Sequence, residues 1–286
     1  MADQALKPGY DVLIIGAGVG GLTAAALLSK AGLSVCVLEK EPRVGGYLAG
    51  FRRKHFIFDT AIHWLNQYGK DGIVNRLFNL LGKDHPLAVP QTRIRRFKGE
   101  RFDFLLTSNP DELKAQLICR FPHEKKGIER LFRQARKIGR SFKNYNRIFR
   151  SEETMNFFEK LWNKFRLLQF VIPCIPYISY SGEKGLKKGL GGFFKDPELH
   201  QLFSGENELL GCLVPIGWAY YGDFQSPPKG GSQVIPLWLQ HVVQFYQNQV
   251  VLQCDVKKII IRNGACSILE FDRHGRHYQV EGRYVI

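Results

Sequence analysis

The sequence predicts an α/β fold in which a parallel sheet and its crossover helices are interrupted by an inserted α+β domain rich in helices. Three features predict this fold: a glycine-rich turn between a strand and a helix near the amino terminus, a hairpin followed by a long amphipathic helix, and a final helix followed by strands. We therefore expect the first domain to comprise residues 1–90 and 226–286, with the inserted domain at 91–225.

The first predicted strand is the apolar run at residues 11–15 (DVLII), which suits a strand buried on both faces of a parallel sheet. Gly16, Gly18 and Gly21 follow at once as GxGxxG, and residues 22–31 continue as a helix. These glycines permit a tight turn, close approach of the backbone to a pyrophosphate, and close packing of helix on strand. The helix amino terminus faces the phosphates. The pattern predicts a Rossmann-like dinucleotide site.

A second strand, residues 34–38 (SVCVL), ends at Glu39, eighteen residues beyond Gly21. An acid at this interval accepts hydrogen bonds from ribose hydroxyls and repels a 2′-phosphate. A GxGxxG by itself also occurs as a merely structural turn. The ordered strand, turn, helix, second strand and acid favour the dinucleotide interpretation.

Two further segments extend the pattern. Residues 40–46 (KEPRVGG) place an arginine and a glycine pair after Glu39, and residues 51–60 (FRRKHFIFDT) have the pattern of a β-hairpin. Together, GAGVGGLTAAALLSKAG, VLEKEPRVGG and FIFDTAIH resemble the FAD-dependent group of phytoene desaturases, carotenoid isomerases and retinol saturases, which are amine-oxidase-like flavoproteins. The resemblance implies FAD rather than NAD. It also implies desaturation, saturation or isomerisation of a lipophilic polyene such as a carotenoid or retinoid.

The same resemblance assigns a cofactor site. The positions that correspond to the family's FAD-binding turns and acid are Gly16, Gly18, Gly20, Gly21, Glu39, Lys40, Arg43, Gly45 and Gly46. Later, Gly230-Gly231 before a helix at residues 234–247 resembles the family's return to the FAD domain, which would place Val256 near the adenine. The glycine pair is also compatible with a simple helix start. Family members continue past the last residue of this chain, which predicts an amino-terminal fragment.

The resemblance offers one catalytic candidate. His63 follows the FDTA segment, which the family places near the flavin, so it is a candidate for proton transfer or flavin tuning. The alternative is that His63 is a structural or exposed histidine without a catalytic role. Trp218, Tyr220, Tyr221 and Phe224 are expected to line an apolar substrate slot. Two other functions stay open: an FAD-dependent amine oxidase, and a flavin-free binding protein similar to Rab GDP-dissociation inhibitors.

The middle of the chain carries much of the net charge of +15. After a predicted hairpin (94–97 and 101–106), apolar residues recur at helical spacing between Ile128 and Phe149, and residues 120–150 hold eleven Lys or Arg against two Glu. An aromatic segment follows. This combination predicts peripheral contact of residues 120–175 with an anionic membrane. The alternative is an ordinary solvated helix face that covers the core of the inserted domain. We do not expect nucleic-acid binding, because no recognisable reader accompanies the charge.

Three further features bear on location and metal binding. Residues 1–10 lack the apolar core of a secretory signal, which predicts a cytoplasmic protein with peripheral membrane contact. The longest uncharged apolar stretch, residues 167–182, contains two prolines and is too short to span a bilayer. The six cysteines are scattered without a zinc-binding spacing, so we expect no metal site.

Overall fold

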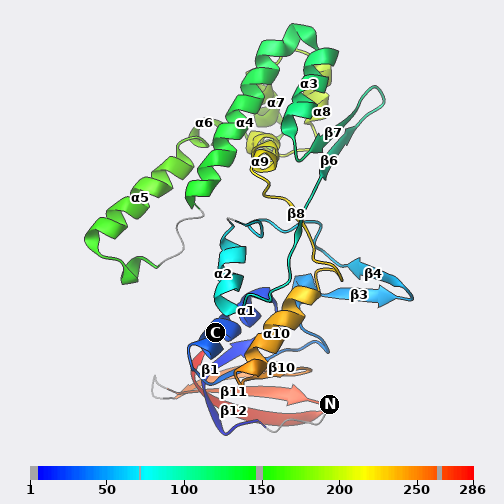
Figure 1. Cartoon of the computed structure of the whole chain (residues 1–286). Helices are drawn as coiled ribbons and strands as arrows, with labels where there is room; N and C mark the ends of the chain where they lie inside the picture. Colours follow the sequence, from blue (N-terminus) through cyan, green and yellow to red (C-terminus); the bar gives the residue numbers. More distant parts are fainter. Residues whose placement is uncertain (1–5, 71, 146–150, 263–265) are drawn as a thin grey trace. The chain divides into compact units, whose positions relative to one another are not determined.

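The computed structural model describes the chain apart from residues 1–5, 71, 146–150 and 263–265. The chain divides into two compact units (Figure 1). The first unit comprises Met1–His63, Leu77–Val89 and Pro227–Ile286, and the second comprises Trp64–Arg76 and Pro90–Ser226. Helix α2 (Ile73–Leu81) contains one of the boundaries.

The first unit is built on a six-stranded sheet with the order β10-β11-β12-β1-β2-β9. Its strands are β1 (Gly9–Ile15), β2 (Val35–Leu38), β9 (Gln249–Val251), β10 (Asp255–Arg262), β11 (Cys266–Arg273) and β12 (Arg276–Val285). Strand β1 pairs in parallel with β2, which pairs in parallel with β9. Strands β10 to β12 form an antiparallel meander, and the end of β12 turns parallel to β1, with Leu13 opposite Val285. The strand before the glycine-rich turn therefore lies inside the sheet.

Helices α1 (Val19–Lys30) and α10 (Val234–Phe245), a hairpin, a 3-10 turn and the end of α2 also belong to the first unit. Helix α1 packs on α10, and β3 (Gly50–Arg53) pairs with β4 (Phe56–Asp59). Alanines on the buried side of α1 allow the helix to lie close to its neighbours. A short 3-10 helix, η1 (Gly46–Leu48), links the glycine pair to the hairpin. Buried apolar side chains from β1, β2, β11 and β12 form the core on the sheet.

The second unit is mostly helical (Figure 1). Its helices are α3 (Pro110–Arg120), α4 (Lys125–Tyr145), α5 (Phe157–Val171), α6 (Ile175–Ile178), α7 (Gly182–Gly191), α8 (Pro197–Leu202) and α9 (Leu209–Tyr220), with 3-10 turns η2 (Pro122–Glu124) and η3 (Glu152–Thr154). Its strands are the hairpin β6 (Arg93–Lys98) and β7 (Asp103–Thr107), and β8 (Gln225–Ser226), which pairs with β5 (Val89–Pro90).

The core of the second unit lies between α4 and α9. Helix α4 buries Ile128, Phe132 and Ile138, members of the apolar stripe that the sequence predicts, whereas Phe149 lies outside the described residues. The two helices cross closely at Gly139 and Gly217. A Cβ atom on Gly139 would lie 2.2 Å from the carbonyl oxygen of Gly217, so only glycine permits this approach.

These elements confirm the predicted α/β class, with a mainly parallel sheet in one unit and a helix-rich second unit. Among the described residues, no helix is both long enough and apolar enough to cross a membrane.

Candidate functional site: a dinucleotide-binding turn and its neighbouring loops

The glycine-rich turn joins β1 to α1. Gly16 adopts a left-handed conformation (φ +99°), and its N–H donates to the carbonyl oxygen of Leu38 at 2.8 Å, which ties the turn to β2. Gly18 is the N-cap of α1. A Cβ on Gly21 would lie 2.2 Å from the Gly16 carbonyl oxygen, so glycine is required there for the first helical turn to lie against the end of the strand. The turn has the close packing that the sequence predicts.

Glu39 lies at the carboxyl end of β2 and is buried. Its carboxylate accepts the N–H of Ala17 at 2.5 Å through one oxygen and the N–H of Glu41 at 2.8 Å through the other. The Glu39 N–H donates to Val251 at 2.9 Å, so β9 also holds this residue. The acid that the sequence assigns to a ribose is therefore fixed directly beside the glycine-rich turn.

The second glycine pair lies against the first turn. Gly45 donates to the carbonyl oxygen of Ala17 at 2.8 Å and forms an isolated parallel bridge with Gly18. Gly45 and Gly46 both adopt positive φ, +129° and +53°. A Cβ on Gly46 would lie 3.4 Å from the Cα of Gly18, within ordinary contact distance. The structure thus brings together two glycine turns that are far apart in the sequence.

The remaining predicted cofactor residues surround this contact. The Arg43 guanidinium donates to the carbonyl oxygen of Gly50 at 2.6 Å, which closes the loop between the acid and the hairpin. Lys40 is exposed. The pKa of Asp255 is lowered mainly by a hydrogen bond from Lys257, and the charge of Lys40 lowers it further. Cys254 donates to the Glu39 carbonyl oxygen at 2.8 Å, so Val256 lies two residues beyond a contact with Glu39.

A third turn supports the loop, and the sequence analysis assigned no role to its side chains. Ser232 is fully buried; its N–H donates to the Asp59 carboxylate at 2.7 Å, and its hydroxyl lies 2.8 Å from the Leu48 carbonyl oxygen. Gln233 donates to Val44 at 2.9 Å and accepts from Gly50 at 3.0 Å. The signal was the pair of polar residues directly after Gly230-Gly231.

His63 lies in an exposed position after β4. It follows Thr60, whose hydroxyl donates to the carbonyl oxygen of Ala49 at 2.7 Å, so the segment before it is tied to the glycine loop. The four aromatic residues that we expected to line one substrate slot do not all line the same cavity. Trp218 and Tyr221 line a cavity of the second unit, whereas Phe224 is buried and the Tyr220 hydroxyl donates to Asp111 at 2.6 Å.

The turn fits a dinucleotide pyrophosphate on structural grounds. A Cβ on Gly18 or Gly20 would meet no protein atom within 4 Å, so open space borders both positions. The first turn of α1 carries no acidic side chain that would oppose an anion at the positive end of the helix. Backbone amides and open space therefore meet at one place.

Comparison with known proteins agrees with this geometry. Residues 14–81 match the family described as NAD(P)-binding Rossmann-like domain. A 4,4′-diapophytoene desaturase from a Methylomonas species is 24% identical over 277 residues, which cover 92% of this chain and 51% of the relative. A chloroplastic prolycopene isomerase 2 from an Oncidium hybrid cultivar is 29% identical over 273 residues, covering 89% of this chain and 44% of the relative. The chain spans about half the length of these curated relatives.

A third relative and two solved structures complete the comparison. An all-trans-retinol 13,14-reductase from Danio rerio is 30% identical over 153 residues, covering 49% of this chain and 25% of the relative. A double mutant of putrescine oxidase matches with a TM-score of 0.57 and 18% identity, covering 97% of this chain and 57% of that one. A Rab GDI from Plasmodium falciparum matches with a TM-score of 0.51 and 14% identity, covering 98% and 65%. At these identities the structures share the fold.

Proposed function

We propose that this chain, a homologue of diapophytoene desaturases, prolycopene isomerases and retinol reductases, binds FAD as part of an oxidoreductase acting on carbon–carbon bonds of a lipophilic polyene. The contact between the two glycine turns, at Gly18 and Gly45, is the observation that carries the FAD proposal. When bound, FAD supplies the redox chemistry, while the protein binds, orients and excludes water. The proposal of a polyene substrate, either a carotenoid or a retinoid, is based on the names of these relatives.

The described residues have chemically suitable roles in this proposal. Gly18 and Gly20 leave room for the pyrophosphate at the start of α1, while Gly16 and Gly21 permit the tight turn that places them there. A carboxylate offers about four acceptor positions, so Glu39 keeps acceptor capacity for ribose hydroxyls beyond the two N–H groups that it binds. Lys40 and Arg43 would supply positive charge to the cofactor, Gly45 and Gly46 allow the second turn to approach, and Val256 would lie toward the adenine.

The FAD proposal can be tested with one substitution. Gly18 has φ −68° and ψ 172°, which valine also adopts, and no protein atom lies within 4 Å of its Cβ position. Gly18→Val should therefore fold but occupy the phosphate space, lowering bound FAD at least tenfold, measured as absorbance at about 450 nm after reconstitution. Gly9→Val is the matched control, because its Cβ meets only Glu281 at 3.9 Å at the other end of β1.

The outcomes separate the alternatives. Equal FAD content in both variants would refute the phosphate placement. A wild-type chain that takes up no flavin would favour the flavin-free binding protein. Incubation of a flavin-loaded protein with carotenoid, retinol and amine panels distinguishes a polyene substrate from an amine. His63→Gln then tests proton transfer: unchanged turnover and pH profile would leave His63 without a catalytic role.

We also infer that the second unit contacts an anionic membrane surface, within residues 120–175. Helix α5 is oriented with apolar side chains outward: Asn163 is buried, whereas Phe157 and Phe158 are 74% and 78% exposed. The inward side also carries Phe170, whose ring lies 5.0 Å from that of Phe142 on α4. At 100° per residue, most of the exposed large apolar side chains share one face of the helix. Leu167, which is 45% exposed, lies off this face. The side chains on the face are Phe157, Phe158, Leu161, Trp162, Phe165, Leu168 and, just after the helix, Ile172.

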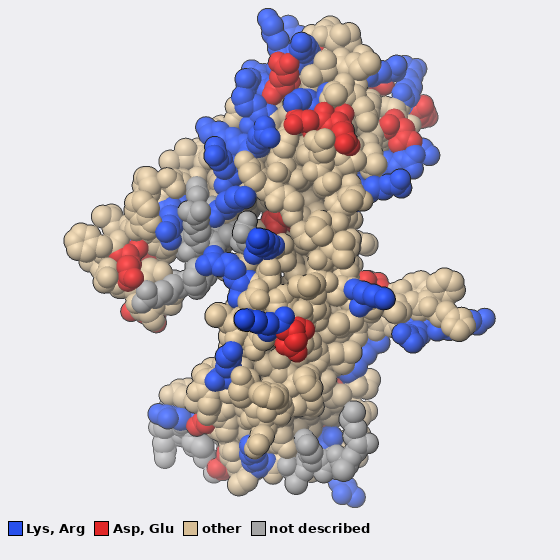
Figure 2. Space-filling model, viewed as in Figure 1, with Lys and Arg blue, Asp and Glu red and all other residues tan. Residues whose placement is uncertain are grey.

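Positive charge lies on the neighbouring helix. Helix α4 carries eight exposed Lys or Arg side chains and one acid, Glu129. Figure 2 shows Lys and Arg gathered along α4, while the surface of α5 is mostly uncharged. Cations attract anionic lipid headgroups, and apolar side chains then enter the interface. An outward apolar face beside a basic helix therefore suits an anionic bilayer surface, from which a lipophilic substrate is also drawn.

A further inference from the structure

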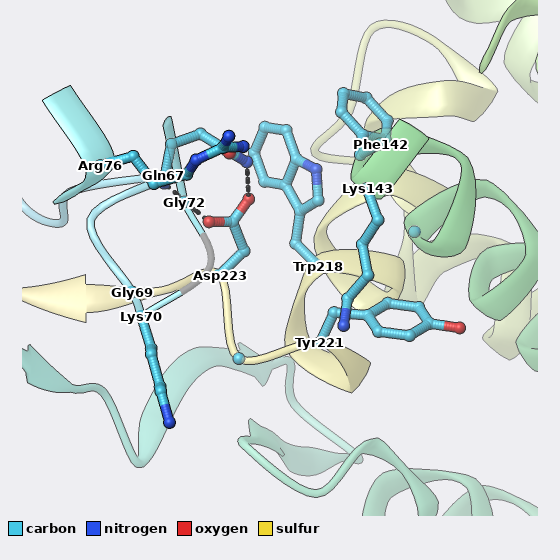
Figure 3. Close-up of a pocket in the computed structure, with 12 residues that line it drawn as sticks. Gln67, Gly69, Lys70, Gly72, Arg76, Phe142, Lys143, Trp218, Tyr221 and Asp223 are labelled. Carbon is cyan, nitrogen blue, oxygen red and sulfur yellow. Dashed lines mark hydrogen bonds between the residues drawn. The ribbon is translucent and has the colours of Figure 1, made fainter. Parts of the chain in front are cut away.

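The second unit contains a cavity of about 620 Å³ between the end of α9, the last turns of α4, and the start of α2 with the loop before it (Figure 3). Cavities of about 300–1,000 Å³ are typical of small-molecule sites. From its lining, we infer that this cavity binds an apolar molecule that ends in an anionic group, a carboxylate or a phosphate. All lining residues belong to the second unit, so the site does not depend on the first unit.

The apolar part of the lining is aromatic. Phe142 and Trp218 meet edge to face with their ring centroids 5.4 Å apart, and Tyr221 lies one turn further along the chain from Trp218. The close crossing of α4 and α9 at Gly139 and Gly217 sets the spacing of the two helices beside these rings, because neither glycine tolerates a Cβ without backbone movement. Rigid aromatic walls of this kind bind flat or extended apolar groups.

The charged part of the lining is mainly positive. Lys70, Arg76 and Lys143 line the cavity and are exposed, and the Lys143 Nζ lies 5.0 Å from the centroid of the Tyr221 ring. The carboxylate in the lining, Asp223, accepts hydrogen bonds from Gln67 through the backbone N–H at 2.7 Å and through Nε2 at 2.5 Å. Burial raises the pKa of Asp223, and these hydrogen bonds oppose the shift. Three cationic side chains therefore face one carboxylate among the described lining residues. The lining therefore favours an anion.

Two buried polar atoms of the lining point to a ligand independently. The Gln67 Oε1 and the Trp218 Nε1 are buried and have no hydrogen-bond partner among the described residues. A buried polar atom without a partner costs about 1–3 kcal/mol, so such atoms call for a partner. The indole N–H donates to an anionic or carbonyl oxygen. Gln67 also has a left-handed backbone (φ +61°), a strained conformation that recurs at binding sites.

The test compares ligands that share one carbon skeleton. All-trans-retinoic acid, retinyl phosphate and retinol are titrated into the 286-residue chain, and quenching of tryptophan fluorescence reports binding. We expect the acid or the phosphate to bind at least tenfold more tightly than the alcohol; the arm that binds better identifies the anionic group. Binding needs neither flavin nor turnover, so this outcome is separate from the fate of the FAD proposal.

Lysine substitutions locate the site. Lys143→Gln should weaken binding of the acid at least fivefold and change binding of retinol less than twofold, because only the anionic group meets the ammonium. Lys137→Gln is the control, since Lys137 is exposed on the same helix and does not line the cavity. Equal affinity for acid and alcohol, equal losses in the two variants, or no binding of any of the three ligands would overturn the inference.

Discussion

Replacing Phe157 and Phe158 with serine should detach the chain from anionic membranes. These side chains are 74% and 78% exposed on the outward face of α5. Full burial of a phenylalanine side chain is worth about 1.5–3 kcal/mol, so burying three quarters of each contributes about 1–2 kcal/mol. The pair therefore contributes about 2–4 kcal/mol to membrane partitioning. At about 1.4 kcal/mol per tenfold change, the partition coefficient should fall roughly 30- to 700-fold.

Co-sedimentation with vesicles measures this partitioning. Vesicles that contain phosphatidylserine should bind the wild-type chain, and pure phosphatidylcholine vesicles should bind it more weakly, because each basic residue near an anionic surface adds about 1 kcal/mol. Phe245→Ser is the matched control, since Phe245 is 72% exposed but belongs to α10. The reasoning fails if wild type does not bind anionic vesicles, or if the α5 double variant and the α10 variant bind equally.

Two further predictions concern stability. Gly21→Ala should lower the free energy of unfolding by about 1–3 kcal/mol, because the new Cβ would lie 2.2 Å from the Gly16 carbonyl oxygen. Gly20→Ala is the control, since its Cβ meets no atom within 4 Å and should not destabilise the fold. Equal urea midpoints for the two variants would contradict this prediction. Burial raises the pKa of Asp223, so the wild type loses stability as pH rises from below 4 through the raised pKa and the buried carboxyl ionises. Asp223→Asn does not ionise, so its free energy of unfolding should rise relative to that of the wild type over the same pH range. The Gln67 amide can rotate to pair with the asparagine, and a pH-independent difference in urea midpoints would exclude this cause.

The Rossmann-like segment was predictable because its signals are local. A strand, a tight turn and a helix depend on neighbouring residues, so the order of DVLII, GxGxxG and Glu39 predicts their arrangement. The helix begins earlier than expected, at Val19 rather than at residue 22, because Gly18 serves as the N-cap and Gly20 and Gly21 belong to the first turn. Small boundary errors of this kind follow from reading the glycines as turn residues only.

The contacts around the glycine turns were not predictable in the same way. Ser232 binds Asp59 across more than 170 residues, and Gly45 bridges Gly18. No periodicity links such positions, because their distance in space is set by how the sheet and hairpin pack. The cavity has the same origin: Gln67 and Asp223 meet although neither belongs to a recognisable motif.

By itself, the sequence determined the α/β class, the GxGxxG turn, the acid at Glu39 and the basic amphipathic helix that became α4. These features depend on residue spacing and local conformational preference. Tertiary structure alone decided that the two glycine turns touch, that Glu39 holds Ala17, and that α5 packs with Asn163 inward and its aromatic face outward. The physical reason is that spacing defines the faces of a helix or a turn, whereas packing of the whole chain decides what each face meets.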